Sequence, residues 1–333
     1  MASQLEPAFG SRACARALGL VRLTCLDIGA RAGFTRDLLP IASSVDAVAF
    51  EPDREECERL NRQAAAGHAP WHSLRYLPVA LGPSDGPKTL NLYRQRGCSS
   101  LLEADRQLAA RYVRDDYFEL DGRVEVDTMP MDDAATRYGF ADATYLKIDV
   151  QGFEREVFRS GSRLIGDSIL AIRAEVSFVP LYKQQPLFGD IAAHLAAFGF
   201  VPLGFEEMHE WRRSTKVKHP IRASGPLPYS RGQLVHGDVL FVRDPETLPD
   251  GNEGDAERLL KAAFLALTYG YVDHAAAICA RRGVTDYLNG RGIRDITEGL
   301  GEASRWHARR YSQSMRRRRL RRVVESIKVM LRR

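Results

Sequence analysis

The stretch LTCLDIGARAGF, residues 23–34, decides the fold of this chain. Its first six residues are largely apolar, with an acid at Asp27, and glycines then break the run at Gly29 and Gly33. A short apolar run that ends in glycines is typical of a buried parallel strand followed by a tight turn. A helix-compatible sequence resumes at Thr35, so the stretch predicts a strand, a turn and the N-terminus of a helix.

The order of the acid and the glycines predicts a ligand site in this turn. Glycine lets the backbone approach a ligand closely, and a helix start offers unpaired N–H groups. Asp27 lies two residues before Gly29, where a carboxylate points at a ligand instead of the core. The pattern D-x-G-x-x-x-G departs from the dinucleotide fingerprint G-x-G-x-x-G and favours a small cationic ligand over a pyrophosphate. The alternative is that both glycines serve only the packing of the turn.

The next strand places a second acid at the same edge of the sheet. The run VDAVAF, residues 45–50, is again apolar and is followed by Glu51. In nucleotide-binding α/β folds an acid at this place accepts hydrogen bonds from two ribose hydroxyls. Pro52 stops the strand, and Asp53 is expected to cap a helix over residues 54–66. The alternative for Glu51 is an acid in a solvated loop.

Strand and helix patterns alternate along the chain up to residue 244. The further predicted strands are residues 73–81, 88–93, 123–127, 143–149, 168–177, 200–203 and 238–242, and the further predicted helices are 97–114, 154–160 and 188–198. Alternating βα units predict an α/β fold with a mostly parallel, doubly wound sheet, whose ligand crevice lies at the carboxyl ends of the strands. Residues 88–93 alternate in polarity and are expected to add an antiparallel strand.

Charged residues occur inside two of the predicted strands. Lys147 and Asp149 share one face of their strand, and Arg173 and Glu175 repeat the pattern on the next one. Charges inside a central strand are costly unless they are paired or functional. The two interpretations are a purely structural ion-pair network and a set of functional groups at the crevice.

Seven motifs, in this order and spacing, resemble the FkbM family of S-adenosylmethionine-dependent methyltransferases. They are LDIGARAGF, FEPD, VALGPSDG, CSSLL, VDTMPMDD, LKIDVQGFEREV and AEVSFVPLYKQQPLFGDI, and the resemblance covers residues 23–242. It implies a Rossmann-like class I methyltransferase fold, with a seven-stranded sheet whose last strand runs antiparallel. It also implies S-adenosylmethionine as the cofactor and O-methylation, commonly of sugar hydroxyls in surface polysaccharides or of secondary-metabolite hydroxyls.

The same resemblance implies roles for the residues at the motif positions. Asp27, Gly29, Ala30 and Gly33 would line the methionine end of the cofactor, and Glu51 with Pro52 would hold its ribose. Ala80 and Leu81, with Ser84 or Asp85, would lie near the adenine, and Asp149 would lie at the boundary between cofactor and acceptor. A cationic sulfonium agrees with the acids at the strand ends.

Methyl transfer from a sulfonium is an in-line displacement, so alignment of the acceptor oxygen with the methyl group can supply much of the acceleration, about 7–11 kcal/mol. A general base would add on the order of 10²–10⁴-fold, and the candidates are Asp149, Glu175 and His209, the last in a predicted loop over residues 206–213. Ser99 and Ser100 are expected either to contact cofactor or acceptor, or to cap the following helix. Because no His, Asp or Glu cluster has clear metal-ligand spacing, we predict no metal.

The composition is that of an ordinary globular protein. The chain has 333 residues, of which 44% are hydrophobic and 27% charged, enough to bury a sizeable core. No apolar run reaches membrane-spanning length, and residues 1–20 have no signal-peptide core. The five cysteines are scattered and odd in number, so we expect reduced thiols in a cytoplasmic protein.

The sequence predicts four parts in chain order. They are a helical lead-in over residues 1–22, the methyltransferase-like domain over 23–244, a linker with a helical hairpin over 245–302, and a basic tail over 303–333. The hairpin consists of a helix from residue 255 to a turn at Gly270 and a second helix over 272–281. It is expected to pack against the body, with a partner-binding role as the alternative.

The tail carries twelve arginines or lysines and one glutamate, although the whole chain has a net charge of only +5. Its arginines mass at residues 316–319, 321 and 322, and an apolar stripe follows through Leu320, Val323, Val324, Ile327 and Leu331. A basic amphipathic helix of this kind suits an anionic membrane surface, which predicts a protein peripheral to the inner face of the membrane. Nucleic acid is the competing partner, because arginine runs bind phosphates, and a solvated or disordered tail is the third interpretation.

Two other classes of function are open to the body. A nucleotide-dependent oxidoreductase is disfavoured by the missing G-x-G-x-x-G pattern. A noncatalytic module that keeps the fold and recruits partners through its tail is disfavoured by the intact acids Asp27, Glu51 and Asp149.

Overall fold

The computed structural model describes residues 8–213 and 231–331, and the side chains of His68 and of residues 314–331 lie outside the description. The chain divides into two compact units. The sheet unit contains residues 23–36 and 45–247, and the helical unit contains residues 1–22, 37–44 and 248–333. The four predicted parts follow chain order, whereas these units do not, and the predicted division stays a prediction.

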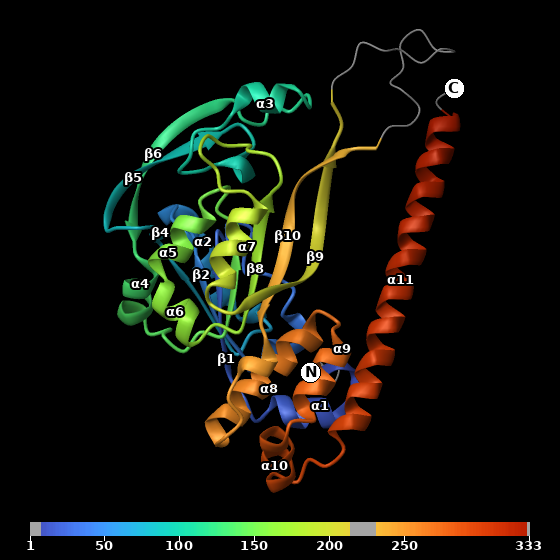
Figure 1. The fold of residues 1–333 in the computed structure, drawn as a ribbon. Helices are drawn as coiled ribbons and strands as arrows, with labels where there is room; N and C mark the ends of the chain where they lie inside the picture. The colour runs from blue at the N-terminus through green and yellow to red at the C-terminus, as the bar shows by residue number, and fades with distance from the viewer. Residues whose placement is uncertain (1–7, 214–230, 332–333) are drawn as a thin grey trace. The chain divides into compact units, whose positions relative to one another are not determined.

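A seven-stranded sheet forms the centre of the sheet unit (Figure 1). Its strands are β1 (Leu23–Ile28), β2 (Val45–Phe50), β3 (Ser73–Leu77), β7 (Tyr145–Ile148), β8 (Ala171–Ser177), β9 (Phe200–Trp211) and β10 (Gln233–Arg243). The spatial order is β3-β2-β1-β7-β8-β10-β9, and β10 runs antiparallel to both of its neighbours. The predicted seven-stranded sheet with an antiparallel last strand is therefore confirmed.

A second, three-stranded sheet in the order β4-β6-β5 belongs to the same unit. Its strands are β4 (Ala80–Leu81), β5 (Gly86–Tyr93) and β6 (Leu120–Met129), and β5 pairs antiparallel with β6. The single strand predicted over residues 73–81 is wrong, because its two ends lie in different sheets. Pro78 separates them, since it has no N–H to donate to a neighbouring strand.

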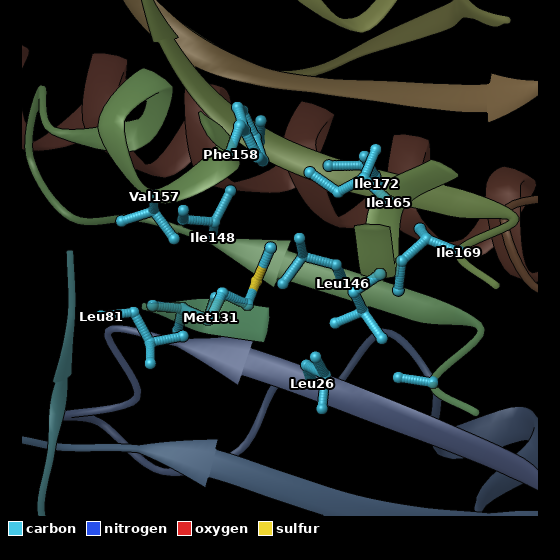
Figure 2. Packing of buried hydrophobic residues seen from close by; sticks show 14 of the residues in the cluster. Leu26, Leu81, Met131, Leu146, Ile148, Val157, Phe158, Ile165, Ile169 and Ile172 are labelled. Atoms are coloured by element: carbon cyan, nitrogen blue, oxygen red, sulfur yellow. The ribbon is translucent and has the colours of Figure 1, made fainter. Parts of the chain in front are cut away.

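The core of the sheet unit lies on the face of the large sheet that is lined by Leu26, Ile28, Leu146 and Ile148. The helices of the unit are α2 (Arg54–Gln63), α3 (Arg106–Ala110), α4 (Met131–Tyr138), α5 (Glu154–Ser160), α6 (Ser162–Asp167) and α7 (Phe188–Ala196). Figure 2 shows side chains of β1, β7 and β8 meeting those of α4, α5 and α6 in this core. The other face of the same strands is free to carry polar groups, because alternate residues point to opposite sides.

The helix predicted over residues 97–114 is mostly wrong. The structure has a 3₁₀ turn, η4 (Arg96–Cys98), and only the short helix α3 in this region. α3 begins after Asp105, whose side chain accepts a hydrogen bond from the N–H of Leu108 at 2.9 Å. The cap therefore comes from Asp105, and the alternative in which Ser99 or Ser100 caps the helix is wrong.

The helical unit is assembled from three separate stretches of the chain. Its elements are η1 (Ala8–Gly10), α1 (Arg12–Leu18), η2 (Leu39–Ser44), α8 (Glu253–Thr268), α9 (Val272–Cys279), α10 (Arg282–Gly290) and α11 (Ile296–Leu331). The ring of Phe9 stacks on Phe264 and lies edge-on to Trp306, with centroid distances of 6.5 and 5.7 Å. Tyr269 donates a hydrogen bond to Asp37 at 3.2 Å, which ties the inserted stretch 37–44 to α8 and its C-terminal turn.

The helical hairpin is present, with α8 beginning at Glu253 and α9 ending at Cys279, and α10 is an additional helix that the sequence analysis missed. α11 is a single helix that continues to Leu331, so the backbone of the basic tail is helical. The predicted apolar stripe and most of the arginines lie outside the described side chains. None of the described helices combines the length and the apolar character that crossing a membrane would require.

Candidate active site

Asp27, the fifth residue of β1, is buried at the carboxyl edge of the sheet and is only 1% exposed. Its Oδ2 accepts a hydrogen bond from the N–H of Thr35 at 2.7 Å, and its Oδ1 lies 3.4 Å from Nζ of Lys147. Burial raises the pKa of Asp27, whereas the Lys147 ammonium and the Thr35 N–H favour the carboxylate. Burial also works against the charge of Lys147, but Asp27 and Asp149 raise the pKa of that ammonium. Each charge of the pair therefore stabilises the other.

The turn after β1 brings the backbones of two strand ends into contact. Gly29 has φ +89°, and a Cβ on it would lie 2.0 Å from the carbonyl oxygen of Asp149. The N–H groups of Gly29 and Ala30 both donate to the carbonyl of Phe50, at 3.3 and 3.0 Å. Gly33, at φ +96°, closes the turn by donating to the carbonyl of Ala30 at 2.9 Å. Only glycine fits at position 29, because both the space and the left-handed backbone exclude a side chain.

The helix predicted to begin near Thr35 is absent. The chain instead passes through turns into the 3₁₀ helix η2, which belongs to the helical unit. The N–H groups that a helix start would leave unpaired are used locally, since Phe34 donates to the Tyr76 hydroxyl and Thr35 to Asp27.

Glu51 follows β2 directly and is 4% exposed, so the alternative of a solvated loop acid is wrong. Its Oε1 accepts a hydrogen bond from the N–H of Asp53 at 3.0 Å. Burial raises the pKa of Glu51, and the hydrogen bond from Asp53 and the charge of Arg31 oppose that rise. Asp53 caps α2 as predicted, through a 3.2 Å hydrogen bond from the N–H of Glu56. Pro52 lies between the two acids and is partly exposed.

The residues predicted to lie near an adenine form the short strand β4 and the turn after it. Leu81 is buried, Ala80 is half-buried, and Ser84 and Asp85 are exposed. Thr128 donates to the carbonyl of Ser84 at 2.8 Å, which fixes the turn. Their role toward an adenine stays a prediction.

Three acids meet where β7 and β8 end. Asp149 follows β7, Glu175 is in β8, and Glu154 is the first residue of α5; one oxygen of each lies within 4.8 Å of the others. Gln151 links two of them, because its Nε2 donates to Oδ1 of Asp149 and to Oε2 of Glu175, both at 2.7 Å. The hydroxyl of Tyr182 lies 2.9 Å from Oε1 of Gln151 and fixes the orientation of the amide. We call these three acids, together with the Gln151 that links two of them, the acid cluster.

The separation of the three carboxylates would suit a hard cation, which takes oxygen ligands. Their oxygens already have protein partners: Oε1 of Glu154 accepts hydrogen bonds from the N–H groups of Val150 and Gly152, at 3.0 and 3.1 Å. Burial raises the pKa of Glu154 to about 7, and the charge of Asp149 adds to the rise. A proton therefore relieves part of the repulsion among the acids, and the predicted lack of a metal stays a prediction.

His236 of β10 completes the cluster, and the sequence analysis missed it. Its Nδ1 lies 3.1 Å from Oε1 of Glu175. Burial lowers the pKa of His236 to about 4, with the neighbouring His209 adding to the shift. Burial, together with Asp149 and Glu154, raises the pKa of Glu175 well above its usual range. Both shifts favour a neutral pair, in which Glu175 and the imidazole share one hydrogen bond.

His209 lies on strand β9 and not in a loop, which corrects the prediction for residues 206–213. It is opposite His236 in the antiparallel ladder, and the two rings stack with centroids 4.5 Å apart. The side chain is exposed. β9 is longer than predicted because its partner β10 extends the ladder well beyond the apolar residues 200–203.

The four charges predicted on β7 and β8 divide into two groups. Lys147 and Arg173 belong to ion pairs, with Asp27 and with Asp238, and Arg173 donates to Asp238 through Nε at 3.0 Å. Asp149 and Glu175 instead meet through Gln151. An ion-pair network and a separate cluster of acids therefore lie beside one another on the same face of the sheet, and a functional role of the acids stays a prediction.

Ser100 holds the backbone of Gln151, a member of the acid cluster. It is 1% exposed, and its hydroxyl donates to the carbonyl of Gln151 at 2.7 Å and accepts from the N–H of Leu102 at 3.0 Å. Gln151 has φ +54°, a left-handed backbone that is uncommon outside glycine and needs such support. The serines of the CSSLL motif thus hold the loop that carries Gln151, and Ser99 accepts a hydrogen bond from the N–H of Tyr93 at 3.3 Å.

Comparison with known protein families gives a match to this chain. The model of the Methyltransferase FkbM domain matches residues 27–202, which is more than half of the chain. No match was found among the curated proteins.

Among solved structures the chain is similar to methyltransferase FkbM from Methylobacillus flagellatus KT, with 13% identity and a TM-score of 0.34. That similarity covers 67% of this chain but only 45% of the other, so the chain spans less than half the length of that protein. Magnesium protoporphyrin IX methyltransferase (ChlM) from Synechocystis PCC 6803, solved with bound SAM, is 12% identical at a TM-score of 0.31 over 69% of this chain and 76% of that one. TrmK of M. capricolum, in complex with S-adenosyl-homocysteine, is 6% identical at a TM-score of 0.31 over 88% of this chain and 98% of that one.

Proposed function

We propose, since this chain belongs to the family of FkbM methyltransferase domains, that it transfers a methyl group to a hydroxyl oxygen, most simply that of a sugar in a polysaccharide or glycolipid. The fold is the class I methyltransferase fold, and S-adenosylmethionine is the methyl donor of the family. O-methylation and the sugar acceptor are the proposed part.

The observation that carries the proposal is the row of acids at the carboxyl ends of four neighbouring strands. Asp27, Glu51, Asp149 and Glu175 end or follow β1, β2, β7 and β8, and these strands are adjacent in the sheet. In open α/β sheets the ligand binds in the crevice outside these strand ends. Acids there suit a donor that carries a sulfonium charge and a ribose diol, and they suit an acceptor whose proton must be removed.

The residues at the first two strand ends fit the donor. The carboxylates of Asp27 and Glu51 are acceptors only, as a cationic ligand and two ribose hydroxyls require. One oxygen of Asp27, Oδ1, is buried without a hydrogen-bond donor among the described atoms, although Lys147 lies 3.4 Å away. In this proposal Asp27, Gly29, Ala30 and Gly33 hold the methionine end, Glu51 with Pro52 holds the ribose, and Ala80 and Leu81 border the adenine.

The acid cluster supplies the proton acceptor. The donor brings an electrophilic methyl group, so the chain must align a hydroxyl and take its proton. Asp149 is the proposed base, because Gln151 occupies its Oδ1 and leaves Oδ2 to accept from the acceptor hydroxyl. Glu175 and His236 hold a shared proton beside it, and Gln151 fixes the distance between the two acids. His209 stays a candidate for contacts to the acceptor, since it is exposed beside His236.

We also propose that the helical tail binds an anionic membrane surface. The support is that α11 continues as a helix through the arginine-rich residues 316–322 to Leu331. Each basic residue near such a surface contributes about 1 kcal/mol. Sedimentation with anionic liposomes at low salt tests this, with neutral liposomes as the control; a chain that pellets with neither has no such role.

Isothermal titration with S-adenosylmethionine and S-adenosylhomocysteine tests the core of the proposal. We expect micromolar binding to the wild type and at least a 100-fold loss in Asp27→Ala, while Asp142→Ala, which changes an exposed residue before the amino end of β7, costs much less. A screen of glycans and lipid-linked sugars for methyl transfer then identifies the acceptor. Failure of the folded wild type to bind either compound would overturn the proposal in favour of a noncatalytic scaffold.

A further inference from the structure

Arg114 has a guanidinium that lies against two aromatic rings. Its Cζ lies 5.0 Å from the ring centroid of Tyr117 and 6.0 Å from that of Trp211. Within the described part of the chain no carboxylate lies within ion-pair distance of it. Two other arginines of this region are paired, since Arg94 contacts Glu119 and Arg96 contacts Asp121. The Arg114 donors are therefore held in place while remaining available to a ligand.

The position of Arg114 is fixed by its own backbone and by the aromatic wall. Its N–H donates to the carbonyl of Ala109 at 3.1 Å, and its carbonyl accepts from the N–H of Tyr117 at 3.1 Å. Trp211 is edge-on to Tyr112, with ring centroids 5.8 Å apart, and the Tyr112 hydroxyl donates to Gln233 at 2.8 Å. A guanidinium on such a support loses little freedom when it binds a ligand.

This wall leads directly to the acid cluster. The ring of Trp211 lies 5.7 Å from that of His236, and His236 lies 3.1 Å from Glu175. These contacts link Arg114 to Glu175 through Trp211 and His236.

Arginines gather at the end of this aromatic wall away from the acid cluster, although Asp115 and Asp116 follow Arg114 in the chain and Glu210 precedes Trp211. The acid cluster lies at one end, and Arg114, with the exposed Arg212 and Arg213 next to Trp211, lies at the other. A neutral acceptor would gain nothing from this polarity. An acceptor with an anionic group would be oriented by it, with the anion toward the arginines and the free hydroxyl toward Asp149 and Glu175.

We propose that Arg114 and Trp211 form a subsite for the anionic group, a phosphate or a carboxylate, of a charged saccharide acceptor. The inference rests on the methyl transfer proposed above and specifies its substrate class. Arg114 binds two oxygens of the anion in a bidentate manner, and Trp211 supplies the flat apolar surface beside it.

The indole N–H signals of the protein offer a direct test, because the chain has only three tryptophans, Trp71, Trp211 and Trp306. The ¹⁵N-labelled protein, saturated with S-adenosylhomocysteine, is titrated separately with glucose 1-phosphate, glucuronic acid and glucose. Trp211→Phe assigns the reporting signal. We expect one of the two anionic sugars to shift the Trp211 signal with an affinity at least about tenfold higher than that of glucose, and the stronger of the two identifies the anion.

Two substitutions make the test specific. Arg114→Gln should weaken binding of the anionic sugar about tenfold or more, and Arg114→Lys should retain part of it, whereas Arg94→Gln, which removes a paired surface arginine, should bind like the wild type. Equal binding of glucose and both anions, no shift with either anion, or unchanged affinity in Arg114→Gln would overturn the subsite. If S-adenosylhomocysteine binds in these same spectra, such a result leaves the methyltransferase proposal intact. If S-adenosylhomocysteine does not bind the folded protein, both proposals fall together.

Discussion

The sheet unit and the helical unit bury different kinds of polar group. In the part of the chain that the structure describes, the buried polar side chains of the helical unit are hydroxyls, those of Ser11, Ser44 and Thr268. Each has a nearby backbone partner, as when Thr268 donates to the carbonyl of Phe264 at 2.7 Å. The sheet unit instead buries the charged side chains of Asp27, Glu51, Glu154 and Arg173.

The difference shows that the buried charges of the sheet unit lower the stability of the chain more than the buried hydroxyls of the helical unit do. A satisfied hydroxyl costs little inside a protein, whereas a buried charge is costly unless it is paired. The carboxylates of the sheet unit lie next to one another, and burial raises the pKa of Glu154 and Glu175. Collecting acids in this way costs stability, and the proposed function of the acid cluster would explain why the chain bears that cost.

The largest effect is expected for the proposed base. Asp149→Asn keeps the shape of the side chain but cannot accept the acceptor proton, so methyl transfer should slow by about 10²–10⁴-fold. The rate of transfer from radiolabelled S-adenosylmethionine measures this once an acceptor is known. Binding of S-adenosylhomocysteine should change far less. A variant with wild-type turnover would show that the acid cluster is structural, like the buried hydroxyls of the helical unit.

Gly29→Ala should destabilise the sheet unit by roughly 2–4 kcal/mol, because a Cβ would collide with the carbonyl of Asp149 and the backbone is left-handed. Gly139→Ala is the matched control. Its φ is also positive, at +67°, but no atom lies within 4 Å of the added Cβ, so it should cost only about 1 kcal/mol. Urea unfolding of both variants measures the difference; equal losses would mean that the strand ends do not meet as described.

The pH dependence of stability should report the acid cluster. Because the pKa of Glu154 is raised from 4.5 to about 7, this residue binds its proton more tightly in the folded chain. Its contribution is fully present below about pH 4.5 and is lost as the pH rises to about 7, at roughly 1.4 kcal/mol per pH unit. Glu154→Gln keeps the acceptor for Val150 and Gly152 but cannot titrate, so its unfolding free energy should fall less over that range. If the unfolding free energies of the wild type and of Glu154→Gln change with pH in the same way, a group other than Glu154 titrates in this range.

The smallest effect is expected in the helical unit. Asn252 caps α8 by accepting a hydrogen bond from the N–H of Asp255 at 3.0 Å. Asn252→Ala should cost about 1 kcal/mol, as lost caps usually do, without changing the affinity for S-adenosylhomocysteine. Thermal unfolding and calorimetric titration of this variant test both statements. If Asn252→Ala lowers the affinity for S-adenosylhomocysteine, the helical unit also contributes to binding, and the contrast between the two units does not hold.

The sequence was sufficient where local pattern and tertiary packing agree. Residues 23–28, 45–50 and 154–160 form the predicted elements, because two apolar strands and a helical pattern can be recognised without knowledge of distant partners. The acids at the strand ends followed from the same pattern.

The remaining features depend on distant contacts. His236 could not be identified, because an isolated histidine gives no sign that Glu175 of another strand will lie 3.1 Å away. Gln151 reads as a loop residue, and its role depends on Ser100 holding its backbone. A helix was wrongly predicted after Gly33, because the sequence does not show that the chain leaves the sheet unit there and joins the helical unit. None of these three features changes the hydrophobic periodicity of the sequence around it, so the local pattern could not predict them.

Residues 37–44 belong to the helical unit although both flanking stretches belong to the sheet unit, so a single cut in the chain cannot separate the two units. The backbone passes from one unit to the other four times, near residues 22, 36, 44 and 247, so neither unit is a continuous piece of chain. Cutting at residue 247 would leave residues 1–22 and 37–44 without the helices that cover Leu38 and Ile41, both fully buried. A gene fragment ending there would expose apolar surface and aggregate. The two units therefore have to be produced as one polypeptide.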